Sequence, residues 1–238
     1  MYTSYIGKKF LEVYKKEYDK PDDYTAEQFF DEEMYPLFFD DERHLMHVGN
    51  SPFFQKSSKK DIEKWGSEPL AKLLRYKQKL DDDNIGGDML VGYGSSDFSA
   101  TTSGQLSDIH EITERNDIIA SWIGQALAFG VSGGVSILID NDEILKTLFS
   151  GWREYRNLLN NTPNVKDKQI ETWNGNYLKL KLNDRRRRIG TSDLEIAETQ
   201  GKLAIQTVDW ISIIFEMTKK FPNKIFTIHG DESNTKDL

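Results

Sequence analysis

The sequence predicts an α+β fold dominated by helices, with about six helices and a few short strands in a single compact domain over residues 1–238. Three observations predict it. Apolar residues recur at helical spacing in most segments, strand-like alternation is confined to short runs, and helices and strands do not alternate strictly as in a βαβ protein. The chain contains 13 Phe, 10 Tyr and 5 Trp among its 238 residues, so it can bury a large core without disulfides.

Three helices are expected in the N-terminal third. Residues 3–18 carry apolar side chains at helical spacing and end before a Pro-Asp-Asp turn. Thr25 and Gln28 have the spacing of a capping box, which predicts a second helix running from there toward Phe39. A third helical pattern covers residues 59–80.

The middle of the chain alternates loop, helix and strand. Residues 89–91 are expected to form a short strand, and the Gly/Ser/Thr-rich residues 92–107 a loop that is the best place for a sub-domain boundary. A helix is expected over residues 108–129, followed by a glycine turn and a strand at residues 135–139.

The C-terminal part predicts two helices and two strands. Residues 142–160 have helical periodicity, and residues 177–182 alternate apolar and polar side chains as in a half-buried strand. A capping box that begins at Ser192 predicts a long helix to about Lys220. Residues 226–228 favour a final short strand.

Residues 118–139 form an uncharged run of 22 residues, long enough to cross a bilayer. The run contains four glycines and has acidic flanks without a positive-inside bias, which favours a buried helix, turn and strand over a membrane span. We therefore expect no membrane association. The expected core is Trp122, Leu127, Val135, Leu138, Leu148, Trp152, Leu180, Val208, Ile211 and Phe215.

The composition excludes several classes of protein. The chain has no cysteine, which excludes disulfide scaffolds, cysteine nucleophiles and thiolate metal sites. Its net charge of −8 argues against a protein that coats nucleic acid through its global field. The first ten residues lack the apolar run of a signal peptide, so a cytoplasmic location is expected. Frequent Lys, Asn, Asp and Ile suggest a prokaryotic source.

The basic segment, residues 179–188, is the first charge feature that stands above background. Six cations and one carboxylate, Asp184, give it a local charge of +5. A strand with two outward lysines, an arginine loop and a helix N-terminus would suit phosphate oxygens, whereas a loop paired with the chain's own acids is the alternative. The candidate polyanion-binding residues are Lys179, Lys181, Arg185, Arg186, Arg187 and Arg188.

The acidic segment, residues 22–42, is the second charge feature. It holds nine carboxylates and no Lys or Arg, interleaved with aromatic residues. The segment is expected either to dock a protein partner or to form helices with a buried aromatic face and a wet acidic face.

A metal site is weighed as an alternative, with no cofactor or metal in the leading interpretation. His and Asp side chains together can hold a divalent ion that activates water. His44 and His47 lack the intervening Glu of an HExxH helix, so no zincin geometry follows. The alternative ligand set is Asp40, Asp41, His44, His47, His229 and Asp231.

These features predict a non-catalytic binding or assembly subunit of a prokaryotic multi-protein complex, which contacts nucleic acid or another polyanion through the basic segment. The first alternative is a metal-dependent phosphoester hydrolase of the nuclease kind. The second is a plain protein-interaction domain whose arginines pair internally. No complete catalytic signature is present in the sequence.

Overall fold

The computed structural model describes residues 2–48, 51–81, 89, 114–183 and 188–232. The fold is mixed and mainly helical, as the sequence predicts, but its helices are divided more finely than the six expected. The elements are α1 (Tyr2–Glu17), α2 (Ala26–Phe29), a π-helical turn (Phe30–Met34), α3 (Tyr35–Phe38), a 3₁₀ turn (Pro52–Phe54), α4 (Lys59–Trp65), α5 (Glu68–Leu80), α6 (Arg115–Ala126), β1 (Phe129–Val131), β2 (Val135–Ile139), α7 (Asp142–Asn161), α8 (Ile170–Leu182), a 3₁₀ turn (Thr191–Asp193), β3 (Ile196–Thr199), β4 (Lys202–Ile205), α9 (Trp210–Lys220) and β5 (Ile228–Glu232).

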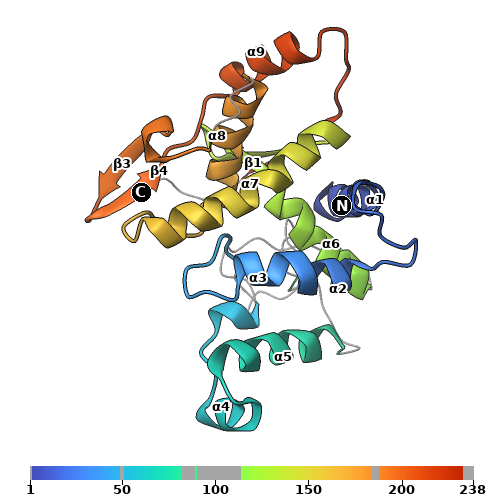
Figure 1. The fold of residues 1–238 in the computed structure, drawn as a ribbon, viewed down its shortest axis with the longest axis vertical. Helices are drawn as coiled ribbons and strands as arrows, with labels where there is room; N and C mark the ends of the chain where they lie inside the picture. Colours follow the sequence, from blue (N-terminus) through green and yellow to red (C-terminus); the bar gives the residue numbers. More distant parts are fainter. Residues whose placement is uncertain (1, 49–50, 82–88, 90–113, 184–187, 233–238) are drawn as a thin grey trace.

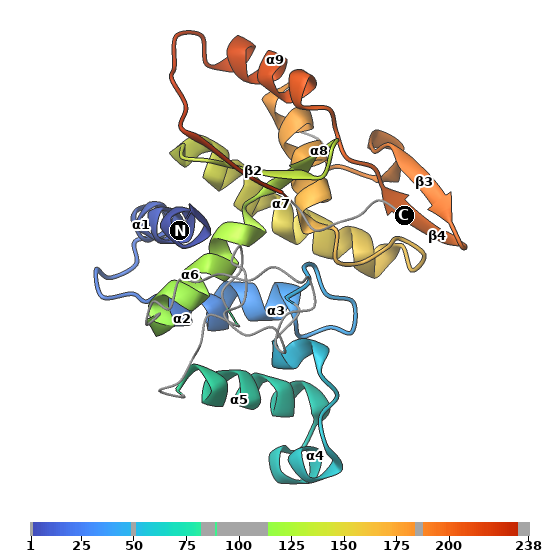
Figure 2. The same ribbon diagram turned by 180° about the vertical axis from the view of Figure 1, so that it is seen from behind.

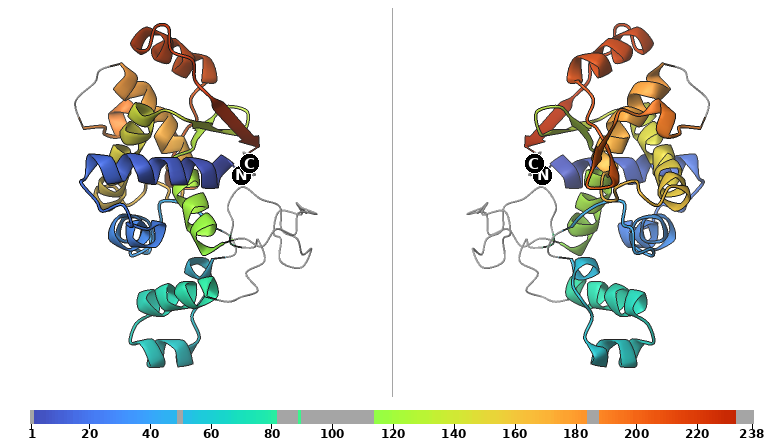
Figure 3. Two further views of the ribbon diagram at one scale, coloured as in Figure 1. Left: turned by 90° about the vertical axis from the view of Figure 1, so that its right-hand side faces the viewer. Right: turned by 90° about the vertical axis from the view of Figure 1, so that its left-hand side faces the viewer.

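The helices α7 and α8 lie in the middle of an elongated molecule. Figure 1 shows α9 at one end of the long axis and the α4–α5 pair at the other. The view from behind shows β2 and β5 side by side between α9 and α1 (Figure 2). Figure 3 shows α4 and α5 projecting away from the remaining helices. Because α8 contacts α9, the described start of the basic segment, Lys179 and Lys181, lies in the same half of the molecule as α9.

Two small sheets complete the fold. The strands β1, β2 and β5 form an antiparallel sheet in the order β1-β2-β5, with Leu138 of β2 opposite His229 of β5. The pairing of β5 with β2 connects the C-terminal end of the described chain to a strand from its middle. The strands β3 and β4 form a separate hairpin in which Thr199 lies opposite Lys202.

Glycines let α1 and α6 pack with their backbones in contact. A Cβ added at Gly7 would lie 1.9 Å from the carbonyl oxygen of Ala120, and one at Gly124 would lie 1.9 Å from that of Thr3. Position 7 faces 120 while position 3 faces 124, so the two helices run antiparallel. No side chain larger than hydrogen fits at either glycine without moving a helix.

Three tryptophans occupy the centre of the core. Trp122, Trp152 and Trp173 are completely buried, and each indole N–H donates to a backbone carbonyl. The acceptors are Met89, Ala126 and Gly151 respectively. Because every buried indole has a partner, these side chains add apolar burial without leaving a polar group unsatisfied.

The strand expected over residues 177–182 is wrong, because these residues form the last turns of α8. The alternating leucines are compatible with both structures: Leu178 and Leu182 are four residues apart and both are buried on one helical face. The helix is buried on most sides, since Ile170 and residues 173–178 are also buried. A helix that is buried all round has no polar face, so its helical period is hidden in the sequence.

The long helix expected from Ser192 to Lys220 is also wrong in its first half. Residues 191–193 form a single 3₁₀ turn, and the β3–β4 hairpin follows. The two residues of the hairpin turn, Gln200 and Gly201, have φ angles of 53° and 75°. Positive φ at both positions is the geometry of a tight hairpin turn and is incompatible with a helix. Only α9, which ends at Lys220, matches the expected helix.

Most of the expected core is buried. Trp122, Leu127, Leu138, Leu148, Trp152 and Val208 are buried, while Val135 and Leu180 are partly buried and pack against the core. The core prediction is wrong for Ile211 and Phe215, which are exposed on α9.

The predicted helix over residues 59–80 also differs from the structure, for a local reason. Residues 59–80 form two helices, because Gly66 adopts a φ of 87° and Ser67 caps a new helix. The predicted strand at residues 89–91, apart from Met89, and the predicted loop at residues 92–107 lie outside the described residues.

The uncharged run over residues 118–139 folds into α6, β1 and β2. In the part of the chain that the structure describes, no helix is both long enough and apolar enough to cross a bilayer.

Candidate polyanion interface

The basic segment begins on the last turn of α8 and continues past it. Lys179 and Lys181 belong to this last turn, and Arg188 follows as an exposed residue. Arg185, Arg186 and Arg187 lie outside the described residues, so the structure does not place them. Positive side chains at a helix C-terminus interact favourably with the helix dipole.

Buried contacts of α8 fix the position of the helix from which the basic segment begins. The buried Asn174 donates from Nδ2 to the carbonyl oxygens of Ala126 at 2.8 Å and Ala128 at 2.7 Å. At the next residue, a Cβ on Gly175 would lie 2.9 Å from the carbonyl oxygen of Gly130. These contacts fasten α8 to the α6–β1 connection, so the start of the basic segment is fixed by buried hydrogen bonds and close packing.

Lys181 is paired within the chain. Its Nζ lies 3.6 Å from Glu154 of α7 and 5.0 Å from the centre of the Tyr177 ring. Glu154 also accepts hydrogen bonds from the Tyr177 hydroxyl and the Ile189 backbone, each at 3.1 Å. Burial, together with the Glu154 charge, raises the pKa of Tyr177 to about 12. Lys181 therefore contributes less free charge than its sequence position suggests.

Lys179 and Arg188 differ from Lys181. Among the described residues, neither makes an ion pair with a carboxylate within 4.0 Å. Asp209 caps α9 and accepts from the Ser212 backbone N–H, which chiefly lowers the pKa of Asp209; the charge of Lys179 adds a smaller lowering. The N-terminal end of α9 therefore lies within electrostatic range of the basic segment.

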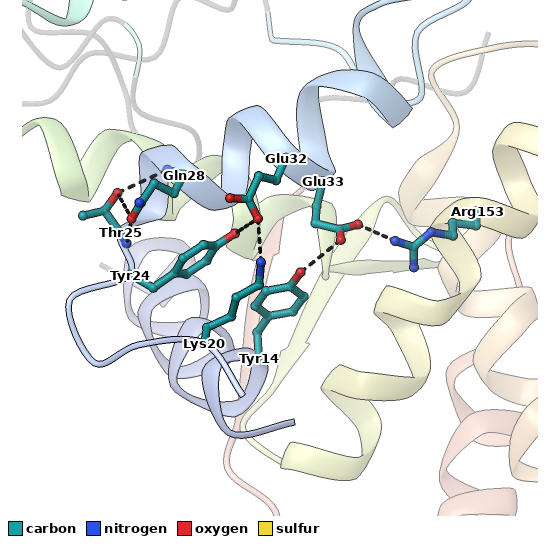
Figure 4. A network of polar contacts seen from close by, with 8 residues as sticks. All are labelled: Tyr14, Lys20, Tyr24, Thr25, Gln28, Glu32, Glu33 and Arg153. Atoms are coloured by element: carbon teal, nitrogen blue, oxygen red, sulfur yellow. Dashed lines mark hydrogen bonds and ion pairs between the residues drawn. The ribbon is translucent and has the colours of Figure 1, made fainter. Parts of the chain in front are cut away.

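The acidic segment is tied to the rest of the chain. Its aromatic side chains Tyr24, Phe29, Phe30, Phe38 and Phe39 are buried. Figure 4 shows Glu32 accepting from Lys20 at 2.7 Å and from Tyr24 at 2.9 Å. The hydrogen bond from Lys20 is the main cause that lowers the pKa of Glu32.

Further carboxylates of the acidic segment have partners of the same kind. Glu33 accepts from Tyr14 at 3.0 Å and pairs with Arg153 of α7 (Figure 4). Asp31 pairs with Lys77 at 2.6 Å. The carboxylates of the π-helical turn thus connect it to α1, α5 and α7. The aromatic face is buried as expected, whereas these acids pair within the chain.

The described residues of the alternative metal site have separate neighbours and differ in burial. His44 is buried beside Phe54, with ring centres 5.0 Å apart, whereas His47 is exposed against the same ring. His229, on β5, stacks on Tyr2 of α1 at 4.0 Å. Asp40 and Asp41 are exposed, and the side chain of Asp231 lies outside the described part. No group of three or more His, Asp and Glu that could hold a metal ion occurs among the described residues.

Two arginines that the sequence did not single out organise the loop after α3. Arg156, buried on α7, donates to the carbonyl oxygens of Leu37 and Arg43, each at 2.8 Å. Arg43 in turn donates to the carbonyl oxygens of Leu159 and Val165. No pattern in the sequence marks either residue, because their acceptors are backbone groups brought together only by the fold.

Comparisons with protein-family models, with curated proteins and with solved structures find no match to this chain.

Proposed function

We propose that this protein is a non-catalytic binding or assembly subunit of a prokaryotic, cytoplasmic complex, and that its basic segment contacts nucleic acid or another polyanion. The observation that carries the proposal is the concentration of six cations and one carboxylate within residues 179–188 of a chain whose net charge is −8. Local charge of this kind favours phosphate contacts at one edge of the protein over coating by its whole surface.

The ion pairs of the described residues support this choice of segment. Elsewhere, many cations contact carboxylates of the same chain: Lys20, Lys77 and Arg153, for example, contact carboxylates of the acidic segment. In the basic segment only Lys181, of the described cations, has such a pair, with Glu154. Lys179 and Arg188 have no carboxylate partner among the described residues, which favours their contact with an external anion.

The fold changes how a phosphate would be held. The α-helix expected to begin at Ser192 is absent, because residues 191–193 form a 3₁₀ turn, so this part of the chain offers no α-helical backbone amides for a phosphate. Recognition would rest on side chains that extend from the C-terminal end of α8. Such contacts hold the phosphate backbone and carry little sequence information.

Docking of a protein partner at the acidic segment stays a proposal of its own. Because the aromatic side chains there are buried, a partner would meet the exposed acids instead, such as Asp22, Asp23 and Glu42. A basic partner surface would fit them.

Titration of binding against salt tests the polyanion proposal. The full-length protein is added to fluorescent single-stranded DNA, duplex DNA and single-stranded RNA, and anisotropy is recorded from low to moderate salt. If three or four cations reach one backbone, the slope of log K against log salt is near −3, with little dependence on sequence. Replacing Arg185, Arg186, Arg187 and Arg188 with alanine should abolish binding and leave the fold unchanged by circular dichroism.

The matched control removes the same charge from α4 and its approach. Lys56, Lys59, Lys60 and Lys64 are exposed at the far end of the molecule, and their replacement with alanine should leave the slope near −3. Absence of binding to all three probes at low salt, by the isolated protein and by its assembled complex, would contradict the proposal. An equal loss in both quadruple variants would show that only the overall charge matters.

A further inference from the structure

The helices α4 and α5, with the residues that lead into α4, form an arm at one end of the molecule (the α4–α5 arm, residues 56–80). Figure 3 shows this arm projecting away from the remaining helices. The helix α5 attaches the arm by burying Ala71, Tyr76 and Leu80, whereas no residue of α4 is buried. A helix whose residues are all at least partly exposed adds little to the core of its own chain.

The α4–α5 arm is strongly basic in an acidic protein. Residues 56–80 hold eight cations (seven Lys and one Arg) and three carboxylates, a local charge of +5 in a chain of net charge −8. Three cations on α5 are engaged within the chain: Lys72 pairs with Glu68 at 3.2 Å, Lys77 pairs with Asp31 at 2.6 Å, and Arg75 donates to Gln55 at 3.1 Å.

The cations of α4 and its approach differ from those of α5. Lys56, Lys59, Lys60 and Lys64 are exposed, and none of them lies within 4.0 Å of a carboxylate in the part of the chain that the structure describes. Lys60 and Lys64 are four residues apart and therefore lie on one face of α4. The positive charge that is open to a partner is thus concentrated at α4.

Apolar side chains lie close to these lysines. Trp65 ends α4 and Leu70 lies in the first turn of α5, so the two residues flank the turn that joins the helices. Leu70 is 43% exposed, Trp65 is partly exposed, and Nζ of Lys64 lies 4.2 Å from the centre of the Trp65 ring. An aromatic and an aliphatic side chain bordered by charged ones have the composition of a protein interface.

We propose that the α4–α5 arm docks an acidic segment of a partner protein. The carboxylates of this partner contact the four exposed lysines, and its apolar side chains cover Trp65 and Leu70. Opposite charge brings the two surfaces together, and the apolar contact distinguishes this partner from other anions. The proposal goes beyond the function proposed above, because it concerns different residues at the other end of the molecule.

The composition of the arm favours an acidic protein over nucleic acid. Three carboxylates, Asp61, Glu63 and Glu68, lie among the lysines and would repel a phosphate backbone. Arginine makes the bidentate contacts that suit phosphate, yet the arm has only Arg75, which already donates to Gln55. The basic segment is the opposite case, since it contains four arginines and a single carboxylate.

Binding of designed acidic peptides tests the proposal. The first probe is a fluorescein-labelled helical peptide of about 18 residues with glutamate on one face and leucine on the other. The second has glutamine at the leucine positions and therefore the same charge. Anisotropy with the full-length protein at about 50 mM salt should give a dissociation constant on the order of 10–100 μM for the leucine peptide. The glutamine peptide should bind at least about fivefold more weakly, because it cannot cover Trp65 and Leu70.

Two quadruple variants separate the arm from the basic segment. Replacing Lys56, Lys59, Lys60 and Lys64 with alanine should weaken binding of the leucine peptide at least about tenfold. Replacing the arginines at positions 185–188 should change it by no more than about twofold, although the same replacement should abolish binding of single-stranded DNA. Failure of this proposal and failure of the polyanion proposal therefore give different results.

Two single variants test the apolar contact. Trp65→Ala and Leu70→Ser should each lower the affinity for the leucine peptide and leave that for the glutamine peptide unchanged, so that the two affinities become similar. Circular dichroism and melting temperatures check that both variants fold, as the partial exposure of both side chains leads us to expect.

Four results would overturn the proposal. No saturable binding of the leucine peptide up to about 0.5 mM would leave the arm without such a partner. Equal affinities of the wild type for the two peptides would show an effect of charge alone. Loss of peptide binding in the arginine variant but not in the lysine variant would place the site at the basic segment. Tighter binding of single-stranded DNA that the lysine variant loses would assign the arm to nucleic acid.

Discussion

At the scale of single residues, Trp152 combines complete burial with a satisfied polar group. Its indole lies among aromatic rings of α1, α2 and α3, and its N–H donates to Ala126 at 2.9 Å. Trp152→Ala would leave a large cavity and remove one of the two donors to the Ala126 carbonyl, so it should lower the free energy of unfolding by about 3–5 kcal/mol. Urea denaturation measures this loss. Trp65→Ala, at the partly exposed end of α4, serves as the comparison and should cost about 1 kcal/mol or less; equal losses would contradict the burial of Trp152.

His44 is a buried residue whose protonation opposes folding. Burial, together with the smaller effects of the Lys168 and Lys72 charges, lowers the pKa of His44 to about 4 against an opposing effect of Asp167. Its Nδ1 is buried and has no hydrogen-bond partner in the described part of the chain. The unfolded chain, with a histidine pKa near 6.5, therefore binds a proton at a higher pH than the folded chain does.

This linkage predicts a loss of stability on acidification. The contribution of His44 is fully present above about pH 6.5 and is lost as the pH falls from there toward 4, by about 2 kcal/mol between pH 7.5 and 4.5. Urea unfolding at the two pH values measures it. His44→Gln should show a smaller drop than the wild type by this amount. An identical pH dependence in the wild type and His44→Gln would show that His44 does not titrate as its burial implies.

At the scale of elements, the contact of α1 with α6 depends on two glycines. Alanine ordinarily stabilises a helix relative to glycine by about 1 kcal/mol. At Gly7 and Gly124, however, the new methyl group would lie 1.9 Å from a backbone oxygen of the facing helix. We therefore expect Gly7→Ala and Gly124→Ala each to lower the free energy of unfolding by about 2 kcal/mol or more.

Chemical denaturation tests this contact with a control from a different loop. A Cβ at Gly190 would meet no atom within 4 Å, so Gly190→Ala should change the stability by no more than about 0.5 kcal/mol. If Gly7→Ala and Gly124→Ala stabilised the protein, the helices would have to lie farther apart than the structure places them.

The alternating leucines of α8 explain why the sequence predicts a strand over residues 177–182. Leucines at every second position satisfy a strand, yet Leu178 and Leu182 also share one face of a helix. Since α8 is surrounded by α7, α9 and β1, side chains on all its faces are buried and no polar stripe reveals the helical period.

At the scale of the whole molecule, the described histidines pack against aromatic rings, and many described carboxylates pair with cations of the same chain. No group of three or more that could hold a metal lies within the described residues. We expect millimolar Mg²⁺ or Mn²⁺ to change the melting temperature by less than about 1 °C, since only a ligand bound to the folded state raises it. Differential scanning fluorimetry measures the shift. A rise of several degrees that disappears in the His44→Ala/His47→Ala double variant would favour the phosphoester hydrolase.

The sequence by itself determined the elements whose side chains alternate between core and solvent. The helices near residues 3–18, 25–39 and 142–160 carry amphipathic stripes, and the capping box of Thr25 with Gln28 forms as its spacing predicts. The burial of the uncharged run followed from its lack of charge, because such a run must be covered in a folded chain.

Only the tertiary structure decided which apolar faces are covered and which charges are paired. Whether residues 177–182 form a strand or a helix depends on α7 and α9, which surround them, and the exposure of Phe215 depends on the absence of any described neighbour outside α9. Likewise, Lys181 meets Glu154 because α7 lies beside α8, while no described carboxylate reaches Arg188. These outcomes depend on contacts between residues far apart in the chain, and local periodicity and spacing carry no record of such contacts.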